Sequence, residues 1–189
     1  GDSLFKSLVD ECSFIVEDIS GIKIIDIIFD KDGSGELKLT ETRYSQIALF
    51  IIEYSLAEYL IQSGVKPNAL LGHSLGEITA ACIAGVFNLK DALEFVIARG
   101  RALQEAPEGA MLAAVLDEET AKTYTNNDVL IATINSHRQC VFSGKIESIS
   151  ELKEVLKNDG INSTLLKSKK PFHTHFLQPA LSGLSEVLN

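Results

Sequence analysis

The pentapeptide GHSLG at residues 72–76 constrains the fold of this chain more than any other feature. It follows the short apolar run 69–71 and precedes the alanine-rich stretch 78–84. A Gly-x-Ser-x-Gly sequence between a strand and a helix is typical of a nucleophile elbow, a turn so tight that the serine backbone is strained and its neighbours must be glycine. The serine oxygen then stands beside free helix N–H groups that can stabilise an oxyanion. The motif therefore predicts an α/β fold with Ser74 as a nucleophile.

The other apolar patterns predict a mixed order of helices and strands. In the first half, helices are expected at 2–12, 40–63, 78–84 and 88–106, while 22–29 suits a strand or a helix. Beyond Met111, strands are expected at 112–116, 129–135, 139–143 and 161–168, and helices at 118–125 and 148–158. This β-α-β-β-α-β order is the ferredoxin-like, split βαβ unit. We therefore predict a small ferredoxin-like subdomain, residues 113–168, inserted in a large hydrolase-like subdomain with a parallel sheet, residues 1–112 and 169–189.

Charge and cysteine content indicate which partners and which cellular location to expect. The net charge of −9 argues against nucleic acid and anionic membranes as main partners. The three cysteines, Cys12, Cys82 and Cys140, are scattered without metal-ligand spacing, which is typical of reduced core thiols in a cytoplasmic protein. We see no signal peptide and no uninterrupted apolar 18-mer. We expect a cytoplasmic protein without a bound metal.

The elbow serine needs a general base, and the chain has four histidines. His73 is adjacent to Ser74, and neighbouring side chains diverge in such a turn. His137 falls in an expected hairpin turn, where an exposed histidine is the ordinary case. His173 and His175 share one segment and would face opposite ways if it is extended, so only one of them could face the serine. The residues alone favour His173 and leave His175 open.

Further motifs accompany the elbow in a fixed order. They are Thr42 and Gln46 followed by Ala48-Leu49-Phe50, the stretch GHSLGEITAACIAGVFN at 72–88, Arg99-Gly100-Arg101, Gln104, Gly109-Ala110-Met111 and Phe172-His173-Thr174. In this order and spacing they resemble the malonyl-CoA:acyl carrier protein transacylase family, especially the acyltransferase domains of polyketide synthases. The resemblance covers nearly the whole chain, and several motifs match together.

The resemblance implies an acyltransferase with a ping-pong mechanism. Ser74 would attack an acyl-CoA thioester and become an acyl ester, with the N–H of Leu75 as one oxyanion donor. His173 would take the serine proton and later activate the phosphopantetheine thiol of an acyl carrier protein. Acyl-CoA is then the donor substrate, no cofactor is bound, and a ketosynthase domain could flank the chain.

The resemblance also implies how the acyl group is selected. Arg99 matches an arginine that pairs with the free carboxylate of malonate, a role suited to its rigid charged fork. Gln46 matches a glutamine near the pocket, and Asn135 an asparagine of the small subdomain. Phe172 favours malonyl over methylmalonyl, because a phenyl ring fills the space of a C2 methyl group, a difference of about 1–3 kcal/mol. Residues 170–171, Lys-Pro, replace the common His-Ala and leave room for a hydroxy- or aminomalonyl unit.

Two departures from the family suggest a piece of a longer protein, truncated at both ends. The family begins with a strand and a Gly-Gln-Gly segment that supplies the second oxyanion donor, whereas this chain opens with Gly1 at a later helix. The family also continues well beyond the segment of His173. Losing one oxyanion donor typically lowers a rate on the order of 10²–10³-fold.

Two alternative functions stay open. A serine hydrolase or thioesterase would use the same elbow with water as acceptor, and would need an acidic residue between the serine and the histidine. The candidates by chain order are Asp91, Asp117, Asp128 and Asp159. The second alternative is a non-catalytic module left by truncation.

Overall fold

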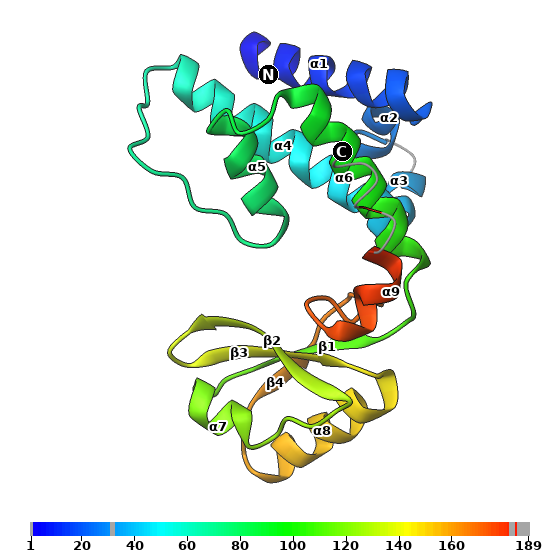
Figure 1. Cartoon of the computed structure of the whole chain (residues 1–189), viewed down its shortest axis with the longest axis vertical. Coiled ribbons are helices and arrows are strands. Elements are labelled where there is room, and N and C mark those ends of the chain that lie inside the picture. The colour runs from blue at the N-terminus through cyan, green and yellow to red at the C-terminus, as the bar shows by residue number, and fades with distance from the viewer. Residues whose placement is uncertain (1, 31–32, 182–183, 185–189) are drawn as a thin grey trace. The chain divides into compact units, whose positions relative to one another are not determined.

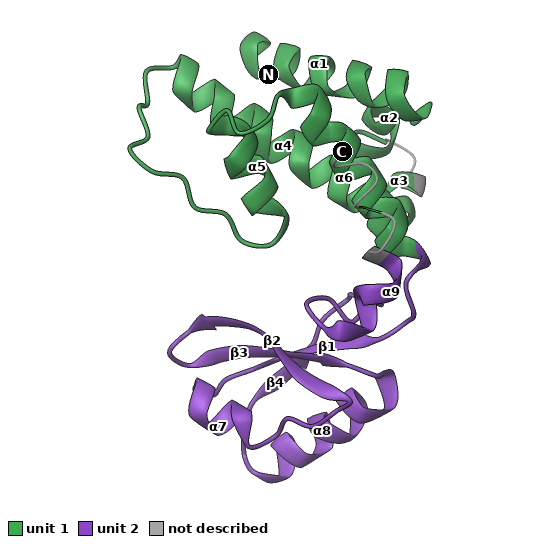
Figure 2. Cartoon of the chain, in the orientation of Figure 1, with its two compact units in different colours: residues 1–104, 183–189 green, residues 105–182 purple. Residues whose placement is uncertain are grey.

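The computed structural model describes residues 2–30, 33–181 and 184 of the chain. The chain divides into two compact units, which we call unit 1 (residues 1–104 and 183–189) and unit 2 (residues 105–182) (Figure 2). Each unit has a buried apolar cluster of its own. The two units are therefore described separately.

The described part of unit 1 is built from helices (Figure 1). They are α1 (Ser3–Ser20), α2 (Ile24–Ile28), α3 (Ser34–Leu39), α4 (Thr42–Gln62), α5 (Leu75–Ile83) and α6 (Leu89–Glu105). Helices α1 and α5 both contact α4, and Phe50 and Ile51 of α4 are fully buried at the centre of the cluster. Burial of the apolar stripes of these helices supplies the main favourable term in folding.

Local capping determines where these helices begin and end. The Asp2 carboxylate accepts hydrogen bonds from the backbone N–H groups of Leu4 and Phe5 at the start of α1. Gly21 ends α1 in the left-handed region at φ 71°. Before α6, the Asn88 side chain accepts a 2.9 Å bond from the Asp91 N–H and so caps this helix. The predicted helix 40–63 is α4, and the ambiguous stretch 22–29 holds α2.

The strand expected at 69–71 is not formed in this structure. Residues 65–73 have neither helix nor strand assignment, and none of the described residues of unit 1 forms a strand. A strand exists only through hydrogen bonds to a neighbour, and the described chain supplies none here. The Leu71 side chain is consequently 99% exposed. The predicted parallel sheet is thus absent from the described residues, while the elbow and the helix after it are present.

Unit 2 contains a four-stranded antiparallel sheet with the strand order β2-β3-β1-β4. Its elements are β1 (Ala110–Ala114), α7 (Glu118–Lys122), β2 (Val129–Ser136), β3 (Gln139–Gly144), α8 (Ile146–Asn158), β4 (Ser163–Leu165), the 3-10 helix η1 (His175–Leu177) and α9 (Gln178–Leu181). Helices α7 and α8 cover the same face of the sheet (Figure 1). Because β3 lies between β1 and β2, this is the predicted ferredoxin-like topology, and the mixed α/β class is confirmed.

The register of the sheet places the core of unit 2. Leu112 pairs with Phe142 on one side and with Leu165 on the other. Leu112 and Phe142 are fully buried, together with Ile149 and Leu156 of α8. Because side chains alternate across a strand, this register turns the apolar set toward the helices. The compact unit is wider than the segment 113–168, since it includes residues 105–112 and 169–182.

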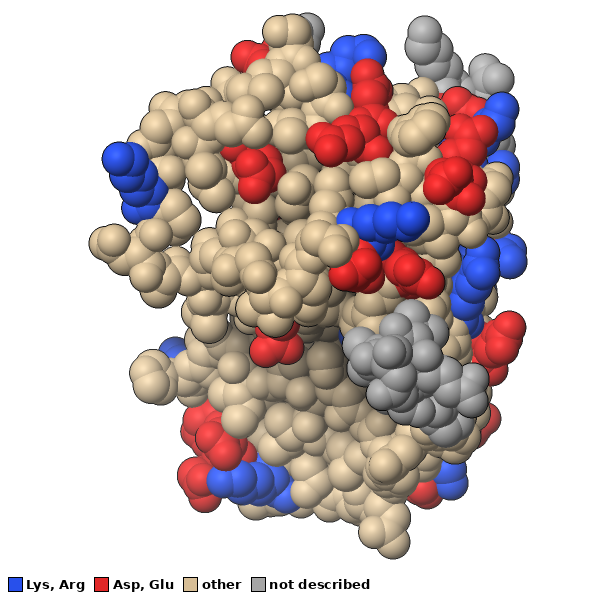
Figure 3. Space-filling view, turned by 45° about the horizontal axis from the view of Figure 1, so that its top comes forward, with Lys and Arg blue, Asp and Glu red and all other residues tan. Residues whose placement is uncertain are grey.

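On the face in Figure 3, acidic and basic residues are interspersed, some beside a residue of opposite sign and others alone. Exposed ion pairs among the described residues include Lys6–Asp10, Lys145–Asp128 and Lys122–Glu118. Such exposed pairs contribute little to stability, because water screens both charges. Among the helices that the structure describes, none is long and apolar enough to cross a lipid bilayer.

Candidate active site

Ser74 has the backbone conformation that a nucleophile elbow requires. Its φ is 55° and its ψ is −113°, at the N-cap of α5. A Cβ on Gly72 would stand 2.2 Å from the Glu77 nitrogen and from the Gly76 carbonyl, so position 72 tolerates only glycine. A non-glycine residue at positive φ costs about 1–3 kcal/mol and persists only where its surroundings impose it. The tight turn at Gly72 is therefore part of the surroundings that impose the strained backbone conformation of Ser74.

The N-terminus of α5 supplies amide donors next to Ser74. The Gly76 N–H donates to the His73 carbonyl at 3.0 Å, and the Glu77 N–H donates to the Ser74 carbonyl at 3.2 Å. The N–H of Leu75 is the first of the helix, and the first amides of a helix lack an acceptor within it. This end of the helix carries partial positive charge. The arrangement suits Leu75 to stabilise an oxyanion beside the serine.

Ser74 lines a groove of about 520 Å³ within unit 1. Its walls come from α4, α5 and the segment 70–74, and most of the lining side chains are apolar, among them Leu49, Leu70, Ala80 and Ile83. Besides His73 and Ser74, the polar residues Glu53 and Thr79 line the groove, and the Thr79 hydroxyl donates a 2.8 Å hydrogen bond to the Glu53 carboxylate. Sequence reasoning missed this pair. The available signal was Glu53, a carboxylate that directly follows the apolar run 47–52 of α4.

Arg99 and Gln46, two predicted substrate-binding residues, meet in unit 1. The Arg99 Nη1 donates to the Gln46 Oε1 at 2.5 Å, and the Gln46 side chain is 9% exposed. Arg99 is half-buried, and burial lowers the pKa of its guanidinium. The bond to Gln46 occupies one of five guanidinium donors. The remaining donors and the poorly solvated charge suit this arginine to bind a carboxylate.

Gly100 allows α6 to approach the start of α4. A Cβ at this position would lie 3.2 Å from the Cα of Arg43 and 3.3 Å from its carbonyl oxygen. Glycine in a helix interior is unfavourable by about 1 kcal/mol, so its presence here indicates a packing requirement. The close approach brings the neighbouring Arg99 within reach of Gln46 on α4.

The other predicted residues, Phe172, His173 and Asn135, lie in unit 2. His173 is exposed and has a φ of 61°, so it shares with Ser74 a left-handed conformation unusual for a non-glycine residue. The half-buried Phe172 precedes it. Asn135 is exposed near the end of β2, beside the hairpin turn that contains His137. The exposed His175 opens η1, with its ring 4.2 Å from that of Phe176.

The four aspartates that a hydrolase could use all have local partners. Asp91 interacts with Asn88 at the start of α6, and Asp128 pairs with Lys145. Asp159 accepts a 2.7 Å bond from the Tyr124 hydroxyl. Asp117 caps α7, and hydrogen bonds from Thr120 hold the pKa of its carboxyl below the ordinary value. Each of these carboxylates thus has a role in local structure.

The chain is similar to known proteins over its whole length. The family model of the acyl transferase domain matches residues 1–189. A phenolphthiocerol/phthiocerol polyketide synthase of Mycobacterium tuberculosis is 32% identical over 188 residues. That match covers 100% of this chain and 12% of the synthase chain. This chain therefore corresponds to a small part of the length of that relative.

Solved structures show the same fold. The acyltransferase domain from the second module of the salinomycin polyketide synthase has a TM-score of 0.87 at 29% identity, covering 98% of this chain and 43% of that one. The acyltransferase domain of SpnD, in complex with 2-(pent-4-yn-1-yl)malonyl, has a TM-score of 0.89 at 29% identity, covering 99% and 44%. MCAT from Streptococcus pneumoniae has a TM-score of 0.80 at 29% identity, covering 96% and 62%. The chain thus spans less than two thirds of each of these chains.

Proposed function

Because the chain belongs to the acyl transferase domain family, we propose that it moves a malonyl-type acyl group from CoA to the phosphopantetheine thiol of an acyl carrier protein. The observation that carries the proposal is the conformation of Ser74, held at φ 55° at the N-terminus of α5. A strained serine beside the first amides of a helix is suited to forming an acyl ester through an oxyanion intermediate.

In the first half-reaction, His173 takes the proton of the Ser74 hydroxyl as the serine oxygen attacks the thioester carbonyl. The Leu75 N–H stabilises the oxyanion that develops on the carbonyl oxygen. When the C–S bond breaks, the CoA thiolate receives the proton from His173 and leaves as a thiol. The acyl group is then an ester on Ser74.

In the second half-reaction, His173 takes the proton of the phosphopantetheine thiol, and the thiolate attacks the ester carbonyl. Breaking the ester C–O bond returns the proton from His173 to the Ser74 oxygen and regenerates the enzyme. The acyl group leaves on the carrier protein. Both half-reactions use one base and one nucleophile, which is the basis of a ping-pong mechanism.

Arg99 is proposed to select acyl groups that carry a free carboxylate. Its half-buried guanidinium keeps donors beyond the one that binds Gln46. A malonyl derivative is the ligand of the similar SpnD domain, which supports a malonyl-type group here. The aromatic ring of Phe172 favours malonyl itself over a C2-methylated unit. Asn135 is proposed to contribute to substrate binding from the small subdomain.

The proposed partners follow from this chemistry. They are malonyl-CoA, an acyl carrier protein and, in a polyketide synthase, a flanking ketosynthase domain. No bound cofactor is needed for acyl transfer between thiols. The three cysteines are free and buried, which supports a reducing cytoplasmic location.

Intact-protein mass spectrometry after mixing with malonyl-CoA tests the proposal. We expect a stable malonyl ester on Ser74 that disappears when a phosphopantetheinylated carrier protein is added. Ser74→Ala should abolish labelling, whereas Ser63→Ala, a change at the exposed end of α4, should not. Rapid loss of the ester to water without carrier would instead indicate a hydrolase. Absence of labelling with every acyl-CoA tried would indicate a non-catalytic module.

A further inference from the structure

We propose that Lys170 is a positioning residue for His173, a buried cation that fixes the segment 168–174 by binding the backbone at the end of α6. The inference rests on the proposed function through the role given to His173. Residues 170–171 are also the Lys-Pro pair that departs from the His-Ala expected from the resemblance. The structure gives the Lys170 side chain a different task.

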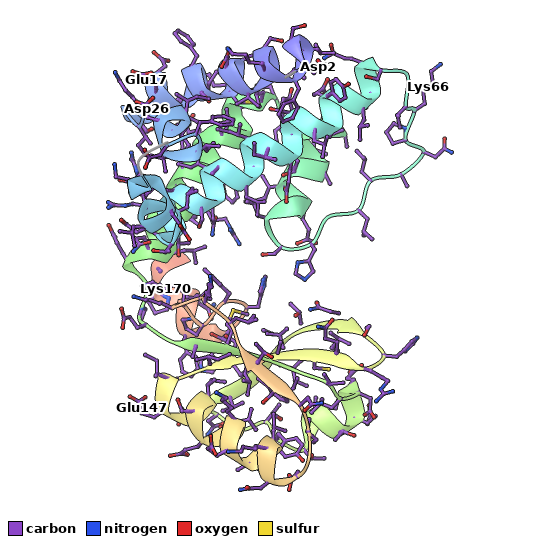
Figure 4. The ribbon with its side chains drawn as sticks, turned by 180° about the vertical axis from the view of Figure 1, so that it is seen from behind. Asp2, Glu17, Asp26, Lys66, Glu147 and Lys170 are labelled. Atoms are coloured by element: carbon purple, nitrogen blue, oxygen red, sulfur yellow. The ribbon has the colours of Figure 1, made fainter. Side chains whose placement is uncertain are left out.

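The Lys170 ammonium is buried and engaged with the main chain. Lys170, which is labelled in Figure 4, is 8% exposed, and its Nζ donates a short hydrogen bond to the carbonyl oxygen of Ala106. Ala106 directly follows α6, and the last carbonyls of a helix have no acceptor role within it. They also carry partial negative charge, so a lysine at this position is favourable. A buried polar or charged group left unpaired is costly, so this contact holds the side chain in place.

The backbone around Lys170 is fixed by hydrogen bonds on both sides. The Ser168 hydroxyl lies 3.0 Å from the Lys170 carbonyl oxygen and 3.2 Å from the Lys170 nitrogen. The Phe172 N–H donates to the same carbonyl at 2.9 Å. The Gly109 N–H donates to the Lys169 carbonyl at 3.0 Å. The Lys170 side chain and the Lys169 carbonyl therefore anchor this short segment to residues 106–109.

Packing reinforces this anchor immediately before the histidine. A Cβ on Gly109 would stand 2.6 Å from the Cβ of Pro171 and 2.7 Å from the Gly144 carbonyl oxygen, so Pro171 lies directly against the Gly109 backbone. The Thr174 hydroxyl donates to the Pro171 carbonyl at 2.6 Å and closes the turn around His173.

The contacts around Lys170 hold the backbone next to His173, whose own conformation is unfavourable. Its φ of 61° is unfavourable for a residue with a side chain. Such a conformation persists only where neighbouring contacts impose it. We infer that the Lys170–Ala106 bond is one of the contacts that impose it, and that the ammonium acts on the backbone rather than on the acyl group.

Steady-state kinetics of Lys170→Met tests this role against a role in selectivity. Methionine keeps most of the chain volume and removes the cation. We expect kcat to fall on the order of 10–100-fold for malonyl and acetyl transfer alike, since small displacements of a catalytic group have effects of this size. The KM for malonyl-CoA and the malonyl-to-acetyl ratio should stay unchanged. Lys167→Met removes an exposed charge three residues away and should leave all these values at wild-type levels.

Amide hydrogen exchange provides a readout that does not require activity. In Lys170→Met the N–H groups of Phe172 and Gly109 should exchange faster, whereas Lys167→Met should leave them unchanged. Lys170→Arg, which keeps a cation that can reach a carbonyl, should restore most of the protection and of kcat. This variant also serves if the methionine variant does not fold.

The outcomes separate this inference from the proposed function. A changed malonyl-to-acetyl ratio in Lys170→Met would make the lysine a selectivity residue and overturn the inference. Unchanged exchange at Phe172 and Gly109 would overturn it as well. If the wild-type chain never forms an acyl ester on Ser74, the proposed function fails, and the exchange data alone still decide whether Lys170 anchors the segment.

Discussion

Single side chains in this protein hold positions that are unfavourable in isolation. Ser74 is strained at positive φ, and the Arg99 guanidinium has lost part of its hydration, which lowers its pKa. Each is compensated by its neighbours, through the turn at Gly72 and through the bond to Gln46. Perturbed groups of this kind gather at functional sites.

Arg99→Ala tests the carboxylate role. The variant should lose malonyl transfer on the order of 10²-fold, because hydrogen bonds to a charged group contribute about 1.5–3 kcal/mol each. Acetyl transfer should fall far less, so acetyl gains relative to malonyl. The exposed Arg101 provides a matched control, and Arg101→Ala should change neither rate. Equal loss for both acyl groups in the Arg99 variant would contradict the assignment.

The buried thiols predict a loss of stability at alkaline pH. Burial raises the pKa of Cys12 from the ordinary value of 9.0 to about 12, and that of Cys82 to about 11. Between pH 9 and the raised pKa of each thiol, the unfolded chain loses its thiol protons while the folded chain keeps them. The free energy of unfolding should therefore be unaffected below pH 9 and fall as the pH rises from 9 toward 12, by an amount on the order of a few kcal/mol.

Urea unfolding across this pH range measures the effect of the thiols. Cys12→Ala should flatten the alkaline fall, although the variant is less stable at neutral pH because it leaves a small cavity. A slope identical to that of the wild type would show that Cys12 does not contribute. As an independent check, a thiol reagent at neutral pH should label none of the three cysteines until the chain is unfolded.

Among the secondary-structure elements, the elbow shows that its two glycines have different tasks. A Cβ on Gly72 would stand 2.2 Å from backbone atoms of Gly76 and Glu77, whereas a Cβ on Gly76 would meet only the Glu53 carboxylate at 3.8 Å. The motif alone treats the two positions alike. The packing of the turn against α5 distinguishes them.

Gly72→Ala and Gly76→Ala form a matched pair of variants. We expect Gly72→Ala to destabilise the chain and distort the elbow, because the added Cβ overlaps fixed backbone atoms. Gly76→Ala should raise the free energy of unfolding by about 0.5–1 kcal/mol, since alanine is the better helix former and its Cβ would make only an ordinary van der Waals contact with the Glu53 carboxylate. Urea unfolding of both variants checks the prediction. Equal effects of the two substitutions would refute it.

For the molecule as a whole, the division into two cores predicts two cooperative units. Phe50 in unit 1 and Phe142 in unit 2 are both fully buried, each at the centre of its own cluster. Replacing either by alanine should lower stability by about 3–5 kcal/mol. Native-state hydrogen exchange should assign the loss mainly to the unit that carries the change. The two variants act as controls for each other, and an equal rise of exchange in both units would contradict the division.

Most helices and the sheet of unit 2 could be predicted because their signals are local. Apolar spacing, caps such as Asn88 and the alternation around Leu112 depend on neighbours within a few residues. The strand expected at 69–71 could not be assigned in this way, because a strand needs a partner and apolar character does not supply one. The same reason left 22–29 ambiguous until packing on the core selected α2.

The sequence by itself determined the nucleophile motif, the set of candidate residues and the family, since all three depend on residue types in a fixed order. Only the tertiary structure decided which of them touch. Arg99 meets Gln46 across 53 positions of sequence because Gly100 lets two helices approach. The Lys170 ammonium binds the carbonyl of Ala106, 64 positions earlier in the sequence. By this contact, a residue that departs from the family pattern anchors the segment of His173. Contacts between residues so far apart in sequence depend on packing geometry, and no local pattern encodes that geometry.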